Sequence, residues 1–216
     1  MTVENNSDNK IRNNDTNNYT NREIKEQKGN SGRNKMNKIL KELLSTGLYL
    51  LSIFIVTWLI VTYVGQRTEV EGQSMEPMLQ NGDNLITDKI TYRFRDPERF
   101  EIVVFPFKYE ESTYFIKRVI GLPGETVWID EDGTIYINGE VLEENYGKEV
   151  IRPDRIGRAC VPITLGEDEY FVMGDNRNDS SDSRTEMVGN VKKSDILGRA
   201  FMRIWPLSKF GILKHK

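Results

Sequence analysis

Histidine and cysteine are almost absent from this sequence. Its 216 residues include one cysteine, Cys160, and one histidine, His215. A single cysteine can form neither an intrachain disulfide bond nor a cysteine-based zinc site, and we expect Cys160 to pack as a small apolar side chain. His215 lies in the basic C-terminal end, where it is poorly placed to serve in a Ser-His-Asp triad. The sequence therefore predicts no metal site, and an activated serine would need a base other than histidine.

A strong excess of charge of one sign is also lacking. The formal net charge is −3. No cluster of Lys and Arg is interleaved with aromatic residues, as binding of single-stranded nucleic acid requires, so we expect no nucleic-acid partner. The charges are nevertheless unevenly spread. Residues 1–42 carry nine Lys and Arg against six Asp and Glu, whereas residues 65–216 carry twenty-one against twenty-seven.

The composition changes abruptly near residue 43. Residues 1–32 are rich in Asn, Lys, Glu and Asp, and they contain too few apolar residues to offset the entropy of an ordered chain. We expect a disordered tail over residues 1–42. Residues 43–64 then contain no charged residue at all. At a rise of about 1.5 Å per residue, a helix of that length crosses a hydrocarbon layer of about 30 Å.

Residues 43–64 have two other interpretations, a buried core helix and a cleaved signal peptide. A core helix normally shows a polar stripe, and a signal peptide has a shorter apolar region followed by a cleavage site with small residues. Neither pattern is present, which favours a retained transmembrane anchor. Five Lys and Arg lie between positions 28 and 41, whereas Arg67 stands alone just after the segment. The positive-inside rule then predicts a single-pass protein of the cell membrane, with a cytoplasmic tail and with residues 65–216 on the extracytoplasmic side.

The extracytoplasmic part has the pattern of a β-rich domain. Apolar and polar residues alternate over residues 126–142, on both sides of Asp132-Gly133, and Asn138-Gly139 provides a second tight-turn signal. The carboxylates near Asp132 lack the spacing of a calcium loop, so a hairpin turn is the better interpretation. We predict a mainly β fold, an antiparallel sheet or barrel-like catalytic domain preceded by one transmembrane helix. Further strands are expected at residues 84–94, 101–107, 114–122, 168–174 and 197–205.

Ser74 is a candidate nucleophile in the segment EGQSMEPML, residues 71–79. A serine hydroxyl reacts poorly until a base takes its proton, and a lysine can do so if burial keeps its amine neutral. Lys117 meets this requirement best, because in a strand it shares a face with Phe115 and Val119, while Arg118 points to the other side. The alternative is an ordinary strand lysine whose amine reaches water.

A polar loop strengthens the hypothesis of a serine-lysine site. Residues 174–184 read GDNRNDSSDSR and follow an apolar strand. Such residues can simply form a turn, but their hydroxyl and carboxylate groups can also aim a neutral amine.

Four segments, taken together, resemble the bacterial type I signal peptidases, membrane-bound serine endopeptidases. The segments are SMEPML at 74–79, GDNLI at 82–86, FIKRVIGLPGE at 115–125 and GDNRNDSSDSR at 174–184. Their order after a single membrane span makes the resemblance specific. It implies a mainly antiparallel β catalytic domain that cleaves signal peptides from secreted preproteins after Ala-x-Ala type sites. It also implies secreted preproteins and membrane lipid as partners, and no metal or other cofactor.

The resemblance also implies roles for individual residues. It makes Ser74 the acylating nucleophile and Lys117 the general base of a Ser-Lys dyad. Ser180 corresponds to a serine that orients the lysine amine. The other supporting positions are Asp182 and Arg184, which support the site, and Gly174, Asp175 and Asn176, which shape its loop.

Two positions depart from the family pattern. Gly72 lies where some members carry a hydroxyl that helps form the oxyanion hole. Because Gly72 has no hydroxyl, the resemblance implies that the backbone N–H of Ser74 donates to the oxyanion hole. The second donor to that hole is unidentified. Met78 replaces a common threonine and is expected to affect packing more than chemistry.

Shallow apolar pockets are expected for the small residues before the cleavage site. The candidates to line them are Ile116, Val70 and Met75. An extended substrate can add to a strand edge through main-chain hydrogen bonds, and residues 71–73 are candidates for that edge.

Three alternatives remain open at this stage. The C-terminal residues 204–216 are either a membrane-interface segment or a last strand with a basic end.

The chain could belong to another class of Ser-Lys protease, the self-cleaving repressors, although a membrane anchor stands where those proteins have a DNA-binding region. It could also be an anchored β domain that binds ligands without catalysis, with Ser74 and Lys117 as ordinary surface residues.

Overall fold

The computed structural model describes residues 38–59, 65–110 and 112–214, in two compact units. The first unit ends at Trp58, and the second begins at Leu59. Most of the predicted disordered tail, and His215, lie outside the described residues.

Among the described residues, an apolar helix spans Lys38–Leu59, and all of it except Leu59 belongs to the first unit. Its 22 residues are long and apolar enough to cross a membrane, and its hydrophobic side chains are exposed. The helix begins five residues before the predicted anchor because residues 38–42 are good helix formers that extend it. Residues 60–64 of the predicted anchor lie outside the described residues.

The second unit is built on two antiparallel sheets, which confirms the predicted mainly β fold. The large sheet has the order β1-β2-β11-β3-β4-β9-β10, and β12 also pairs with β11. Its strands are β1 (Gly65–Glu69), β2 (Asn84–Asp88), β3 (Ile102–Pro106), β4 (Tyr114–Gly121), β9 (Glu169–Met173), β10 (Val191–Lys192), β11 (Gly198–Trp205) and β12 (Gly211–Ile212). The small sheet has the order β7-β6-β5-β8, with β5 (Thr126–Ile129), β6 (Ile135–Ile137), β7 (Glu140–Val141) and β8 (Ile163–Thr164).

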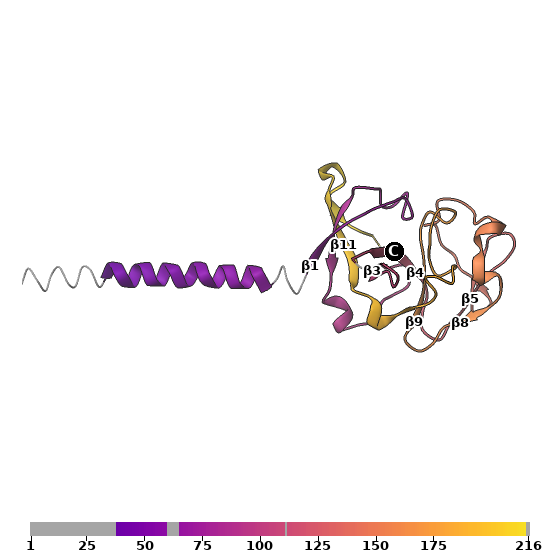
Figure 1. Ribbon diagram of the computed structural model, residues 1–216, viewed down its shortest axis with the longest axis horizontal. Helices are drawn as coiled ribbons and strands as arrows, with labels where there is room; N and C mark the ends of the chain where they lie inside the picture. The colour runs from indigo at the N-terminus through magenta and orange to yellow at the C-terminus, as the bar shows by residue number, and fades with distance from the viewer. Residues whose placement is uncertain (1–37, 60–64, 111, 215–216) are drawn as a thin grey trace, which may run out of the picture. The chain divides into compact units, whose positions relative to one another are not determined.

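The small sheet lies beside the β4 and β9 end of the large sheet (Figure 1). Ile120 of β4, together with Phe171 and Met173 of β9, packs against the apolar faces of β5 and β6. A second core cluster lies beneath the segment that contains Ser74 and includes Met75, Leu79 and Ile116. The two sheets therefore share one apolar layer, and β4 borders both clusters.

The predicted hairpin is present. Asp130 and Thr134 close the turn between β5 and β6, and Gly133 has φ 82°. Asn138 and Gly139, with φ of 55° and 86°, form the turn between β6 and β7. Positive φ at both positions is the geometry that Asn-Gly favours in tight hairpins.

The strand predicted over residues 84–94 is too long. β2 ends at Asp88, whose carboxylate accepts hydrogen bonds from the N–H groups of Ile90 (2.9 Å) and Thr91 (3.1 Å). This side-chain cap competes with strand pairing and starts a short 3₁₀ helix, Thr91–Arg93. Four further 3₁₀ helices are described, at Pro153–Arg155, Gly157–Cys160, Lys193–Asp195 and Leu207–Lys209.

The expectation for Cys160 is wrong, because its side chain is exposed. Cys160 is the last residue of the 3₁₀ helix Gly157–Cys160, and Ala159 occupies the buried position of that turn.

The C-terminal segment continues the sheet. β11 runs to Trp205, and β12 turns back to pair with it, as the strand alternative predicts. Four large apolar side chains of this hairpin are exposed: Trp205, Leu207, Phe210 and Ile212. Contact of this hairpin with a membrane stays a prediction.

Candidate active site

Ser74 and Lys117 lie in hydrogen-bonding contact, although 43 residues separate them in the chain. Ser74 belongs to the turn between β1 and β2, and Lys117 lies in the middle of β4. The Lys117 Nζ donates to Ser74 Oγ at 2.9 Å and to the carbonyl oxygen of Ile116 at 3.0 Å. This separation is short enough for a proton to pass between hydroxyl and amine.

The amine of Lys117 is buried without a carboxylate in contact. The residue is 4% exposed, and among the described residues it forms no ion pair. Burial lowers the pKa of Lys117 from 10.5 to about 8, with help from the charge of Arg184, while the charges of Asp182 and Asp175 act in the opposite direction. A substantial fraction of the amine is therefore neutral at mildly alkaline pH, which is the state that a base requires.

The loop that begins at Gly174 holds the backbone of Ser74. Asn176 donates its N–H to the Ser74 carbonyl oxygen at 3.0 Å and its side-chain amide to the Gln73 carbonyl oxygen at 3.2 Å. A Cβ on Gly174 would overlap both the Ser74 carbonyl oxygen and Ser180 Oγ. The loop therefore needs glycine at position 174 in order to approach the nucleophile segment this closely.

Asp182 and Arg184 form a buried ion pair behind this loop. Arg184 donates to both carboxylate oxygens, Nε to Oδ1 and NH2 to Oδ2, each at 2.8 Å. Asp182 also accepts the N–H of Gly174 at 3.0 Å. Burial alone would raise the pKa of Asp182, but the hydrogen bonds and charge of Arg184 lower it below the usual range. Asp182 is therefore an anionic support for the loop.

Asp175 forms a second buried ion pair, with Arg118. Arg118 Nε and NH2 donate to the two carboxylate oxygens at 2.7 and 2.6 Å, and NH1 donates to the Phe100 carbonyl oxygen at 2.8 Å. Burial raises the pKa of Asp175, and the guanidinium of Arg118 opposes that rise. The sequence reasoning placed Arg118 on the opposite face from Lys117 but missed this pairing. An arginine next to a candidate lysine in an apolar strand was the available signal.

The orienting role expected for Ser180 stays a prediction. Its hydroxyl oxygen is buried and forms no hydrogen bond of normal geometry with any described residue, Lys117 included. It lies close enough to Asp182 to contribute weakly to lowering the pKa of that carboxylate.

The N–H of Gly72 does not point into an open oxyanion site. It donates to the side-chain oxygen of Asn81 at 2.8 Å, in a turn where Gly72 has φ 84°. The N–H of Ser74 donates to no group within the described part of the chain. Of the two positions expected at the oxyanion hole, Ser74 is therefore the one whose backbone N–H has no acceptor among the described residues.

A cleft of ≈ 740 Å³ opens beside Ser74 and Lys117. Its lining comes from residues 66–75, which lead from β1 to the nucleophile, and from residues 112–117, just before and within β4. Asp179 and Ser181 of the polar loop complete it. The three expected pocket residues, Val70, Met75 and Ile116, all border this cleft. Their side chains are 3%, 1% and 7% exposed, so they form its apolar floor more than its rim.

The strand edge of the cleft is β1 and not residues 71–73, which form a bend. β1 ends the order of the large sheet and pairs only with β2 among the described strands. The sequence reasoning missed β1 because residues 65–69 are polar and follow directly on the apolar segment.

Comparison with known proteins places this chain in a family. The family profile described as "Signal peptidase, peptidase S26" matches residues 43–205. The probable signal peptidase I-2 of Synechocystis sp. is 44% identical over 157 residues, which cover 70% of this chain and 68% of the relative. Signal peptidase I of Leptolyngbya laminosa is 42% identical over 160 residues, or 70% of this chain and 74% of the relative. Signal peptidase I of Bacillus caldolyticus is 36% identical over 158 residues, or 69% and 84%. The chain belongs to the signal peptidase I family, the peptidase S26 family of serine endopeptidases that remove signal peptides from preproteins.

Proposed function

We propose that Ser74 and Lys117 are the catalytic dyad of this signal peptidase. The observation that carries the proposal is the 2.9 Å contact between Ser74 Oγ and an amine whose burial lowers its pKa to about 8. Desolvation removes the preference of lysine for the charged state, and contact with the hydroxyl gives the neutral amine a proton to accept. Neither the single histidine nor a carboxylate is needed for this chemistry.

The proposed reaction has two halves. In the first half, the neutral Lys117 amine accepts the proton of Ser74 Oγ as that oxygen attacks the scissile carbonyl carbon. The resulting ammonium then protonates the leaving nitrogen, so that the peptide bond breaks and an ester forms on Ser74. In the second half, the neutral amine takes a proton from water, which attacks the ester, and the proton returns to Ser74 as the acyl group leaves.

The N–H of Ser74 is the proposed donor to the developing oxyanion. It is uncommitted within the described part of the chain, unlike the N–H of Gly72. Removing one donor from such a hole typically costs ~10²–10³ in rate. The hydrogen bond from the Asn176 side-chain amide to the Gln73 carbonyl oxygen would fix the direction of the Ser74 N–H, because both groups belong to one planar peptide unit.

The supporting residues keep their proposed roles. Asp182 and Arg184 hold Gly174 in place, and Asn176 holds the carbonyl oxygens of Gln73 and Ser74. Asp175 fixes the start of this loop through its ion pair with Arg118. We assign Ser180 to orienting the Lys117 amine during the reaction, when Ser74 Oγ has bonded to the substrate.

The cleft is the proposed substrate site for residues that precede the cleavage point. An extended signal peptide would pair with the free edge of β1, and small side chains of an Ala-x-Ala type site would rest on Val70, Met75 and Ile116. The shallow apolar floor favours alanine over larger side chains, because Val70, Met75 and Ile116 are already packed in the core.

The apolar helix is the proposed membrane anchor. We place residues 1–42 in the cytoplasm, the anchor within the predicted 43–64 segment and the β domain, residues 65–216, outside the cytoplasm at the cell membrane. Secreted preproteins and membrane lipid are the proposed partners. Anchoring both enzyme and signal peptide in one membrane raises their effective concentration.

Cleavage of a preprotein with an Ala-x-Ala site tests the proposal. The full-length protein in detergent is compared with its Ser74→Ala and Lys117→Ala variants, and the products are identified by mass spectrometry. Cleavage after that site by the parent, with losses of ~10³-fold or more in both variants, is the expected result. Cleavage by folded Lys117→Ala at the parent rate would show that the base is another group.

A further inference from the structure

A segment outside the four motifs fastens the loops that hold Ser74. Residues 144–148, here called the strap, follow β7 of the small sheet. Glu144, Tyr146 and Lys148 alternate along this segment, and each contacts a residue of the candidate active-site framework.

The first contact is the ion pair of Glu144 with Arg177. The Glu144 carboxylate accepts from Arg177 NH1 at 2.6 Å and from NH2 at 2.8 Å, and Arg177 is 2% exposed. Arg177 in turn donates Nε to the Gly174 carbonyl oxygen at 3.0 Å. Glu144 thereby anchors the loop from Gly174 to Arg177.

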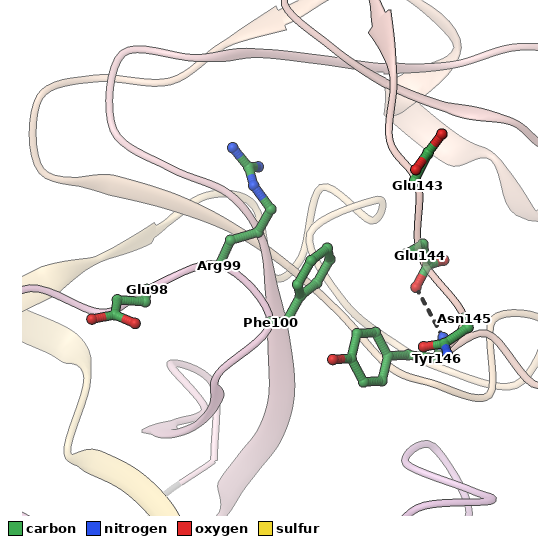
Figure 2. A pocket seen from close by; sticks show the side chains of 7 residues that line it. All are labelled: Glu98, Arg99, Phe100, Glu143, Glu144, Asn145 and Tyr146. Carbon is green, nitrogen blue, oxygen red and sulfur yellow. Dashed lines mark hydrogen bonds between the residues drawn. The ribbon is translucent and has the colours of Figure 1, made fainter. Parts of the chain in front are cut away.

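The second contact is that of Tyr146 with Arg118. The guanidinium carbon of Arg118 lies 3.8 Å from the centre of the Tyr146 ring. Figure 2 shows the ring of Tyr146 beside that of Phe100, from a different part of the chain, and the ring centres are 5.1 Å apart. A cavity of ≈ 770 Å³ borders these two rings. Tyr146 therefore separates the buried pair of Arg118 and Asp175 from an open space.

The third contact comes from Lys148. Its N–H donates to the Asp175 carbonyl oxygen at 2.8 Å, and its amine donates to the Glu76 carboxylate at 2.9 Å. Glu76 lies two residues after Ser74. The strap thus joins the nucleophile turn to the loop that carries Asp175.

None of the strap residues lines the cleft beside Ser74 and Lys117. An effect of the strap on catalysis must therefore pass through the framework and not through contact with the substrate. From Tyr146, such a route runs to Arg118, to Asp175, and through Asn176 to the carbonyl oxygen of Ser74.

We propose that Tyr146 is a positioning residue, whose ring covers the Arg118–Asp175 ion pair and thereby holds the loop that fixes Ser74 against Lys117. This inference rests on the proposed dyad. Losing the ring admits water to the guanidinium, weakens the ion pair and lets the loop shift, and displacements of about 1 Å at reacting atoms can cost about 10²-fold in rate.

Tyr146→Ala in the full-length protein tests the proposal, with Tyr136→Ala as the matched control. Tyr136 is also half-buried and also stacks on an aromatic ring, that of Trp128 at 4.5 Å, but it lies on β6 of the small sheet. We expect Tyr146→Ala to lower kcat by about tenfold or more while KM stays within about twofold. Tyr136→Ala is expected to keep kcat near that of the parent, and Tyr146→Phe is expected to restore it because the covering ring remains.

The same assay includes the parent and Ser74→Ala, so that failure of the dyad is distinguished from failure of the strap. An inert parent, or an active Ser74→Ala, would reject the proposed function itself. Given an active parent, the strap proposal is overturned if folded Tyr146→Ala keeps its kcat, if only KM changes, or if Tyr136→Ala loses as much kcat. Should Tyr146→Ala unfold, Tyr146→Leu retains apolar bulk without the flat ring, and a kcat equal to that of the parent would overturn the proposal equally.

Discussion

The two faces of β4 each bury a basic side chain, but only one of these side chains has a carboxylate partner. Lys117 and Arg118 are adjacent, and both are almost completely buried, at 4% and 0% exposure. Arg118 has a carboxylate in bidentate contact, a backbone carbonyl and an aromatic ring. Among the described residues, Lys117 has a hydroxyl and a carbonyl oxygen in hydrogen-bonding contact and the Phe115 ring 5.0 Å from its amine, but no paired carboxylate.

The presence or absence of a paired carboxylate decides whether the buried side chain stays charged, as Arg118 does, or can lose its proton, as Lys117 can. Burial penalises a charge, and a paired carboxylate offsets that penalty on the Arg118 side. On the Lys117 side, the penalty is met by losing the proton, so the pKa falls to about 8. Arginine cannot take that second route, because its guanidinium stays protonated in proteins. The order Lys-Arg in this strand therefore places an amine that can be neutral, the proposed base, on one face and a permanent charge on the other.

Exchanging the two cation types gives the largest expected effect. Lys117→Arg keeps the positive charge but removes any neutral state, so we expect signal-peptide cleavage to fall ~10³-fold or more. Arg118→Lys loses the bidentate geometry and is expected to lose stability while keeping measurable cleavage. Initial cleavage rates, with circular dichroism to confirm folding, make the comparison, and a folded, active Lys117→Arg would contradict it.

Neutralising the partner on the structural face is expected to destabilise the fold. Asp175→Asn leaves the Arg118 guanidinium buried without its counter-charge, which typically costs about 3–5 kcal/mol. Asp154→Asn is the control, because Asp154 is 68% exposed and its ion pairs lie at the surface. The free energies of unfolding of the full-length proteins are compared in detergent by denaturant titration. Equal stabilities for the two variants would mean that the buried pair contributes nothing.

Removing the cation on the reactive face is expected to stabilise the fold. The pKa of Lys117 falls from 10.5 to about 8 on folding, and each tenfold change in proton affinity is worth about 1.4 kcal/mol. Because the unfolded chain binds the proton more tightly, burial of Lys117 destabilises the protein at every pH below about 8. The destabilisation disappears as the pH rises from about 8 towards 10.5.

Lys117→Met should therefore raise the free energy of unfolding near pH 7 by up to about 3 kcal/mol, a gain that shrinks at alkaline pH. Lys108→Met changes an exposed lysine and is the control. The free energies of unfolding of the parent and of both variants are measured at pH 7 and pH 10. A destabilised Lys117→Met at pH 7 would mean that the amine is better accommodated than its lack of an ion pair implies.

The smallest effect is expected for Ser180→Ala. The hydroxyl has no hydrogen bond of normal geometry to a described residue, so stability should change little. If Ser180 orients the Lys117 amine only during the reaction, kcat should fall by about tenfold, the worth of one hydrogen bond. A kcat unchanged from the parent would remove Ser180 from the mechanism.

Local patterns in the sequence are sufficient to predict part of the fold and of the candidate site. The alternation around Lys117 correctly predicts a buried lysine in a strand, because side-chain period in a strand is two and Phe115 and Val119 share its face. Asn138-Gly139 predicts its turn because few other dipeptides accept two positive φ values.

The remaining features depend on long-range contacts, which a local pattern does not encode. Tyr146 reaches Arg118, and Lys148 reaches Glu76, 72 residues away, only once the small sheet has folded against β4 and β9. The end of β2 at Asp88 was missed for another reason, since its carboxylate captures nearby N–H groups that an apolar pattern cannot register. β1 was missed because its residues are polar and the strand lies at the sheet edge.

The pH dependence of kcat/KM for a signal-peptide substrate without titratable side chains near the cleavage site tests the central claim most directly. This ratio reports the ionisation of the free enzyme, in which Lys117 must be neutral to accept the proton of Ser74. We predict that kcat/KM rises with pH and levels off around an inflection near the pKa of about 8. A profile that is flat across that pH, or that still rises towards the ordinary lysine pKa of 10.5, would contradict the assignment of a desolvated Lys117 as the base.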